Sequence, residues 1–168
     1  MTTQTNVLGT AQGIAMDISG LAGDSNLLAG FESGQISATA NSYDVLVNVN
    51  PITGHASTAP TVGQKIELWV WGADTSLATT AWDALDGTTG TVTLGHDAAK
   101  FAMCNVASPA VTVATVAKTY PILPFSLANC FGGVVPDFWG LFLVHNHTGA
   151  LAASQSGLFS YQIVTPTT

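Results

Sequence analysis

The segment Tyr43-Asp-Val-Leu-Val-Asn-Val-Asn50 establishes the fold class, because apolar residues occupy every second position along it. One set of alternate positions holds Tyr43 and three valines, whereas the other holds Asp44, Leu46 and two asparagines. Since successive side chains of a β-strand point to opposite faces of a sheet, this period of two predicts a half-buried strand. The segment ends at Asn50-Pro51, which predicts a turn directly after it.

The same period of two recurs in later segments. Between residues 66 and 71, aliphatic residues alternate with Glu67, Trp69 and Trp71, and Gly72 follows. Two further strong candidate strands, 138–146 and 158–165, lie near the end of the chain. Shorter candidates are separated by Gly, Asp, Asn or Pro and lie at 13–18, 33–39, 92–94, 100–105, 110–116 and 119–123.

Helix signals are few. Ser126 has the side chain of a helix N-cap, and Gly132-Gly133 would end a short turn that starts there. A second short helix is expected at 80–85. Short strands separated by frequent turn signals are typical of all-β sandwiches. The sequence therefore predicts an all-β fold, an antiparallel β-sandwich of jelly-roll type with about 8–10 short strands.

Residues 1–30 differ in composition from residues 31–168. They contain no aromatic residue, and their few aliphatic residues are scattered among Gly, Ala, Ser, Thr and Asn. Such a segment is ordered only where other surface covers it. We therefore expect an extended N-terminal arm over 1–30 and a β-sandwich domain over 31–168. Pairing of a first strand near 13–18 within its own domain is an equally open alternative. The aliphatic residues of the arm that we expect at an interface are Ile14, Ile18, Leu21, Leu27 and Leu28.

The chain is poor in charge. Of its 168 residues 8% are charged, and ten acidic residues against three lysines give a net charge of -7. Because phosphate binding uses clusters of Arg and Lys, we expect no nucleic-acid partner. No apolar run approaches the roughly 20 residues of a spanning helix, so we expect no membrane partner. The first ten residues lack the basic start of a signal peptide, so we expect the chain to stay in the compartment where it is made. In that compartment Cys104 and Cys130 are expected to be reduced, buried thiols.

Candidate catalytic and metal-binding residues are sparse. His145 and His147 would project from one face of a strand, where two imidazoles can share a metal, but no third ligand follows them. Glu32 and Glu67 could act as a carboxylate pair, yet single acidic residues on strands are more often solvated. No serine or cysteine has the spacing of a nucleophile. We therefore expect no enzyme, no catalytic residue, and no metal or other cofactor.

An all-β domain with so little charge is expected to cover its apolar surface by association. If the aliphatic positions of 66–71 face the core, Trp69 and Trp71 point to the opposite face, into a second layer or an interface. Trp82, the one large apolar residue of the 73–90 loop, either fixes that loop to its own core or contacts a partner. The aromatic interface candidates are Trp69, Trp71, Trp82, Phe138 and Phe142.

Two stretches carry a resemblance to a known family. One is Cys130-Phe-Gly-Gly-Val-Val-Pro-Asp-Phe-Trp-Gly-Leu-Phe-Leu-Val-His-Asn-His-Thr-Gly-Ala-Leu151, and the other is Gly63-Gln-Lys-Ile-Glu-Leu-Trp-Val-Trp-Gly72. Together they resemble small virion structural proteins of tailed bacteriophages, in which a Gly-Gly-x-x-Pro-x-x-Trp-Gly turn leads into a strand ending His-Asn. The similarity runs from about Leu27 to Tyr161, and its motifs are structural.

This resemblance implies a capsid cement or decoration protein. Such a chain would be made in the host cytoplasm and would assemble on the outer capsid surface of the virion. Its partners would be the major capsid protein and further copies of itself, as a homotrimer, and it would stabilise the shell by burying apolar surface.

Two other functions stay open. A phage tail or receptor-binding component would use a similar sandwich. A jelly-roll carbohydrate-binding module would stack sugar rings on Trp69, Trp71 and Trp82. An enzyme is the least favoured reading, since no constellation of catalytic residues supports it.

Overall fold

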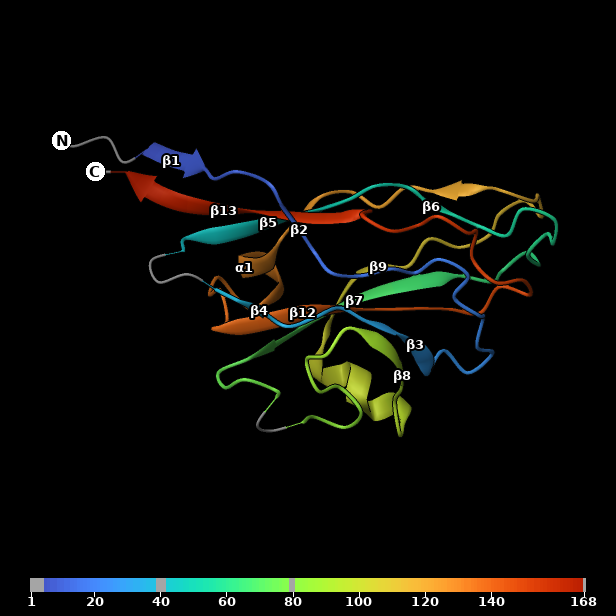
Figure 1. Ribbon diagram of the computed structural model, residues 1–168, viewed down its shortest axis with the longest axis horizontal. Helices are drawn as coiled ribbons and strands as arrows, with labels where there is room; N and C mark the ends of the chain where they lie inside the picture. Colours follow the sequence, from blue (N-terminus) through green and yellow to red (C-terminus); the bar gives the residue numbers. More distant parts are fainter. Residues whose placement is uncertain (1–4, 39–41, 79–80, 168) are drawn as a thin grey trace.

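The computed structural model describes residues 5–38, 42–78 and 81–167, and strands provide most of the regular structure in these ranges. Two antiparallel sheets lie one above the other, with both termini at one end of the molecule (Figure 1). This confirms the all-β, antiparallel class. Neither helical segment of the described chain has the length and apolar sequence that crossing a membrane requires.

The upper sheet has the strand order β1-β13-β5-β11, and β2 also pairs with β13. All of its pairs are antiparallel. The short helix α1 directly follows β11. These elements are β1 (Thr5–Leu8), β2 (Gln12–Gly13), β5 (Asp44–Val49), β11 (Phe125–Ser126), α1 (Leu127–Cys130) and β13 (Phe159–Thr167).

The lower sheet has the order β8-β3-β12-β7-β9, and β4 pairs with β12. A separate small pair joins two loops. The strands of the lower sheet are β3 (Ala29–Glu32), β4 (Ile36–Ser37), β7 (Ile66–Ala73), β8 (Gly90–Thr93), β9 (Cys104–Ala107) and β12 (Phe138–His145). The small pair is β6 (Ile52–Thr53) with β10 (Thr119–Tyr120), and the 3-10 helix η1 (Asp97–Ala102) precedes β9.

Strands β12 and β7 form the centre of the lower sheet. They pair along their whole length, from Phe138 opposite Ala73 to His145 opposite Ile66. Gly140 lies opposite Trp71, and a Cβ atom at Gly140 would overlap the indole ring. The absence of a side chain at Gly140 therefore lets the Trp71 indole pack directly against β12.

The lower sheet is buried on both faces. Between the sheets lies the inner core, in which Val47 of β5 packs with Leu68 of β7 and Leu143 of β12. On the opposite face lies the outer core, in which the described residues of segment 74–103 outside strand β8 cover the sheet. The fully or nearly buried members of the outer core are Trp71, Leu77, Leu85, Leu94, Ala99, Met103, Phe142 and Val144.

The N-terminal segment departs from the predicted arm. Strand β2 pairs with β13, and the Ile14 amide donates to the Phe159 carbonyl. Ile14, Ile18 and Leu21 are buried in the inner core, so the prediction that residues 1–30 form an arm with these three at an interface is wrong. The chain instead takes the alternative of pairing within its own domain. The reason is the alternation of buried Ile14, Met16 and Ile18 with exposed neighbours, which fits one open side of the inner core.

Most other predicted elements are confirmed, including β5, β7, β12, β13 and the helix that Ser126 caps by accepting from the Asn129 amide. Three are wrong. Residues 100–105 begin as a 3-10 helix, and 110–116 contain an isolated bridge at Ala110 but no strand. The helix expected at 80–85 is a turn closed by a bridge between Trp82 and Leu85, and Thr80 lies outside the described residues.

Candidate functional site

The aromatic interface candidates pack mostly within the chain. Trp71 and Phe142 are fully buried in the outer core, so the prediction that they lie at an interface is wrong. Segment 74–103 forms the second layer that the sequence analysis gave as the alternative to an interface for Trp69 and Trp71. Trp69 and Trp82 are half-buried against the same core, and Phe138 is half-buried at the start of β12. A sugar-stacking platform on the three tryptophans is therefore not available, because Trp71 is covered.

The remaining two aliphatic candidates, Leu27 and Leu28, are half-buried against the outer core. The Asp24 carboxylate fixes this turn, since its Oδ2 accepts from the amides of Leu28 and Ala29 at 2.7 Å each. Both residues therefore contribute to the chain's own packing.

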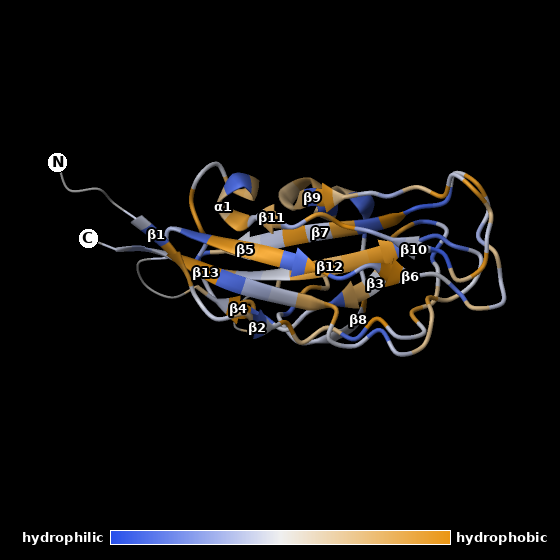
Figure 2. Cartoon of the chain, turned by 90° about the horizontal axis from the view of Figure 1, so that it is seen from above, coloured by the Kyte–Doolittle hydropathy of each residue, from blue (hydrophilic) through white to orange (hydrophobic). Residues whose placement is uncertain are grey.

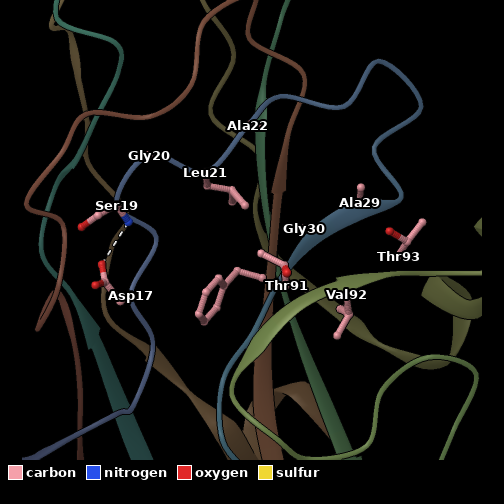
Figure 3. A pocket seen from close by; sticks show the side chains of 11 residues that line it. Asp17, Ser19, Gly20, Leu21, Ala22, Ala29, Gly30, Thr91, Val92 and Thr93 are labelled. Carbon is pink, nitrogen blue, oxygen red and sulfur yellow. Dashed lines mark hydrogen bonds between the residues drawn. The ribbon is translucent and has the colours of Figure 1, made fainter.

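A shallow hollow of about 400 Å³ lies beside the edge of the lower sheet (Figure 3). Asp17 and residues 19–22 form one wall, and residues 29–31 and 91–93 form the other. Its polar groups are already engaged locally, because Asp17 accepts from the Ser19 amide at 3.0 Å.

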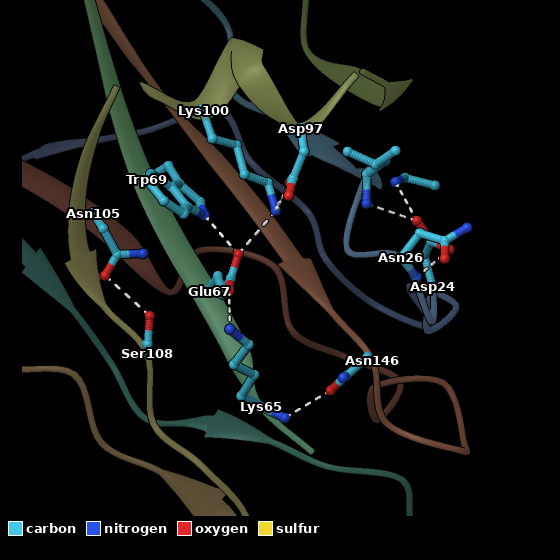
Figure 4. Close-up of polar contacts among 12 residues, drawn as sticks. Asp24, Asn26, Lys65, Glu67, Trp69, Asp97, Lys100, Asn105, Ser108 and Asn146 are labelled. Carbon is cyan, nitrogen blue, oxygen red and sulfur yellow. Dashed lines mark hydrogen bonds and ion pairs between the residues drawn. The ribbon is translucent and has the colours of Figure 1, made fainter. Parts of the chain in front are cut away.

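Glu67 is the centre of a buried ionic cluster (Figure 4). Its Oε2 accepts from Lys100 Nζ at 2.9 Å and from Trp69 Nε1 at 3.0 Å, while Lys65 pairs with Oε1. Glu67 and Lys100 are each only 5% exposed. Burial alone would raise the pKa of Glu67, but the hydrogen bonds from Lys65 and Lys100 outweigh it and hold the pKa below its usual value.

This cluster fixes η1 to the sheet. Lys100 comes from η1 and lies 5.5 Å from the Trp69 ring centroid, so its ammonium has both a carboxylate and an aromatic face as neighbours. Both oxygens of the Glu67 carboxylate are engaged. A carboxylate held in this way anchors structure.

Glu32 anchors a different loop. Its carboxyl group is fully buried and accepts from the amides of Gly87 at 3.0 Å and Asp86 at 3.3 Å. Burial raises the pKa of Glu32 to about 7. Glu32 and Glu67 thus each hold their own segment of the outer-core cover, and the structure does not join them as a pair.

His145 and His147 are both buried at the end of β12. The His145 Nδ1 accepts from the His147 amide at 3.2 Å, which places the proton on Nε2, where it is donated to the Leu21 carbonyl at 2.9 Å. Burial lowers the pKa of both imidazoles, that of His147 to about 4. Within the described ranges no group of three or more His, Cys, Asp or Glu side chains is placed to hold a metal.

Three exposed apolar residues, Val7, Leu8 and Tyr43, lie at the end of the molecule where β1 pairs with β13, and others, such as Phe101 and Leu123, lie on other segments. All four residues of β1 are exposed, and β1 pairs with residues 164–167 of β13. We call these two paired segments the terminal ribbon, and Figure 2 shows it projecting beyond the body of the sheets. The ribbon carries Val7 and Leu8, and the exposed Tyr43 lies beside it through a bond from its amide to the Val164 carbonyl.

Comparison of the chain with protein-family models, curated proteins and solved structures found no match. The terminal ribbon, the charge-poor surface and the strand order are therefore the features from which function is inferred.

Proposed function

We propose that this chain is a virion structural protein of a tailed bacteriophage, and within that class a decoration protein that binds the major capsid protein on the outer capsid surface. The terminal ribbon is the observation that carries the proposal. It presents exposed Val7 and Leu8 on a strand whose second edge has no partner among the described residues. Such an edge can add to a sheet of a neighbouring subunit.

The strand order supports a jelly roll, a fold common in viral capsid subunits. The first strands, β1 and β2, lie beside the last strand, β13, and the next, β3 and β4, lie beside β12. The series continues inward, since β5 lies beside β11 and β7 beside β9. This first-with-last pairing is what a long hairpin produces when it is rolled into two sheets.

The proposed mechanism is mechanical. Each copy would bury the ribbon and other apolar surface against neighbouring shell subunits, with copies joined as a homotrimer. A protein that binds the expanded shell in preference to its precursor stabilises the expanded state by its binding free energy. The low content of charge fits a surface made for such contacts, since interface cores are depleted of charged residues.

The copy number in purified virions tests the proposal. Quantitative mass spectrometry would measure the ratio of this chain to the major capsid protein. We expect a ratio near equimolar for a decoration protein. A few copies per particle would assign the chain to the tail or a vertex instead, and absence from virions would overturn the virion role.

A deletion tests the ribbon itself. Removing residues 2–10 leaves β2 and the buried Ile14 in place, so the body should still fold. We expect the shortened chain to lose binding to expanded shells that lack the protein, measured by co-sedimentation. The matched control is Phe101→Ser, which removes an exposed apolar side chain on η1, far from the ribbon, and should leave binding unchanged. Full binding by the shortened chain would contradict the role of the ribbon.

A further inference from the structure

The two cysteines of the chain come from different sheets and line the same hollow. Cys104 is the first residue of β9, at the edge of the lower sheet, and Cys130 is the last residue of α1, beside the edge of the upper sheet. Both are half-buried, and both line a hollow of about 430 Å³ together with Phe125 and Asn129. The thiols are thus accessible from solvent at the place where the two sheet edges meet.

The two cysteines face one hollow, and the Cys130 thiol is held by its own helix. The Cys130 thiol donates to the Ser126 carbonyl at 3.4 Å, which fixes it in the single turn of α1. Burial raises the pKa of the Cys130 thiol to about 12, and the neighbouring Cys104 thiol adds to the shift. Cys130 is therefore a poor first nucleophile, and reaction with an oxidant is expected to begin at Cys104.

We propose that Cys104 and Cys130 form an intramolecular disulfide when the chain meets a low-molecular-weight disulfide such as oxidised glutathione, and that this bond cross-links the two sheets. The inference depends on the placement of the two cysteines and is independent of the virion role. It also revises the expectation that both thiols stay reduced and structural.

The exchange balances in two steps. The Cys104 thiolate attacks one sulfur of oxidised glutathione, the disulfide between the two glutathiones breaks, and one glutathione thiolate leaves. The Cys130 thiol then loses its proton and attacks the Cys104 sulfur of the mixed disulfide, so the second glutathione leaves. Two protein thiols are oxidised, one glutathione disulfide is reduced to two thiols, and the two protons released by the protein pass to the leaving thiolates.

The cross-link should stabilise the fold. It closes the loop between residues 104 and 130 and so restricts the unfolded chain. For a chain of this size we expect the Tm to rise by about 5 to 10 °C, and a reductant should reverse the rise.

Intact-mass spectrometry of the full chain tests the proposal. After incubation with oxidised glutathione and denaturation in maleimide, we expect the mass to fall by two hydrogen atoms and no maleimide to attach. The Cys104→Ser and Cys130→Ser variants are the matched controls, and neither should show the rise in Tm. Two maleimides or two glutathione adducts per chain, or a disulfide-linked dimer, would overturn the bond. A bond that leaves the Tm unchanged would overturn the cross-linking effect.

Discussion

The two faces of the lower sheet are buried by different means. The inner face packs against a second sheet, and the cluster there is mainly aliphatic, with Val47, Leu68 and Leu143 as examples, together with the aromatic Tyr120, Trp139 and Phe159. The outer face is covered by segment 74–103, and here Glu32 and Glu67 are buried beside the apolar cluster. Strands satisfy their backbone groups within the sheet, so two sheets can meet largely through apolar side chains, and the buried His145 serves a loop by donating to the Leu21 carbonyl. An irregular cover leaves amide groups unpaired and needs buried acceptors.

Acidic residues supply such acceptors both to the outer cover and to loops elsewhere in the chain. Glu32 accepts from the amides of Asp86 and Gly87, Asp83 from that of Gly95, and Asp44 from that of Ala128. The negative charge of the chain therefore serves loop structure to a large extent, and it need not indicate a cationic partner. The comparison of the two faces leads to four expectations.

The largest effect is expected from Glu67→Leu. This change leaves the Lys100 ammonium buried without its carboxylate and should cost about 3–5 kcal/mol of unfolding free energy. The double variant Glu67→Leu, Lys100→Met removes both charges and should regain most of that loss. Chemical denaturation of the single and double variants measures both the loss of unfolding free energy and its recovery. A single variant as stable as the parent chain would contradict the anchoring role of the cluster.

The pH dependence of stability is expected to differ in sign between two buried groups. Glu32 has a folded pKa of about 7, above its unfolded value of 4.5, so its contribution is greatest below pH 4.5 and is lost as the pH rises through 7. The loss should reach about 3 kcal/mol. Denaturation from pH 4.5 to 8 should show that the unfolding free energy of the parent chain declines relative to that of Glu32→Gln. The glutamine keeps an acceptor but cannot ionise. A constant difference between the two chains would contradict it.

The contribution of His147 to stability should change with pH in the opposite direction. Its folded pKa of about 4 lies below the unfolded value of 6.5, so stability is present above pH 6.5 and is lost as the pH falls towards 4. The loss relative to His147→Gln should again reach about 3 kcal/mol. Between about pH 4.5 and 6.5 the two groups should offset each other in the parent chain. Because burial also lowers the pKa of His145, a contribution that rises with pH remains in the parent chain, and Glu32→Gln should depend on pH more steeply than the parent in this range.

Sequence predicted the inner core and its strands well, because the period of two in 44–49, 66–73 and 138–145 reports directly on alternating faces. Its departures have physical causes. The alternation at 14–18 was too short to separate a strand from an arm. Segment 74–103 has no period, so the outer core was foreseen only as one alternative for Trp71. The Glu67 cluster had one local sign, a lysine two positions before Glu67 on the same strand face, but Lys100 lies 33 residues away.

The smallest effect is expected from Phe101→Ser. Lys100 and Phe101 are neighbours on η1, yet the lysine is 5% exposed and the phenylalanine 91%, the reverse of their hydropathies. The ionic cluster turns this helix so that Lys100 faces the sheet and Phe101 faces solvent. Because an exposed side chain loses little on truncation, the unfolding free energy should change by less than about 0.5 kcal/mol. Denaturation at two protein concentrations measures this. A larger loss that grows with concentration would instead mean that Phe101 is buried against another copy of the chain, which would add η1 to the surfaces through which it associates.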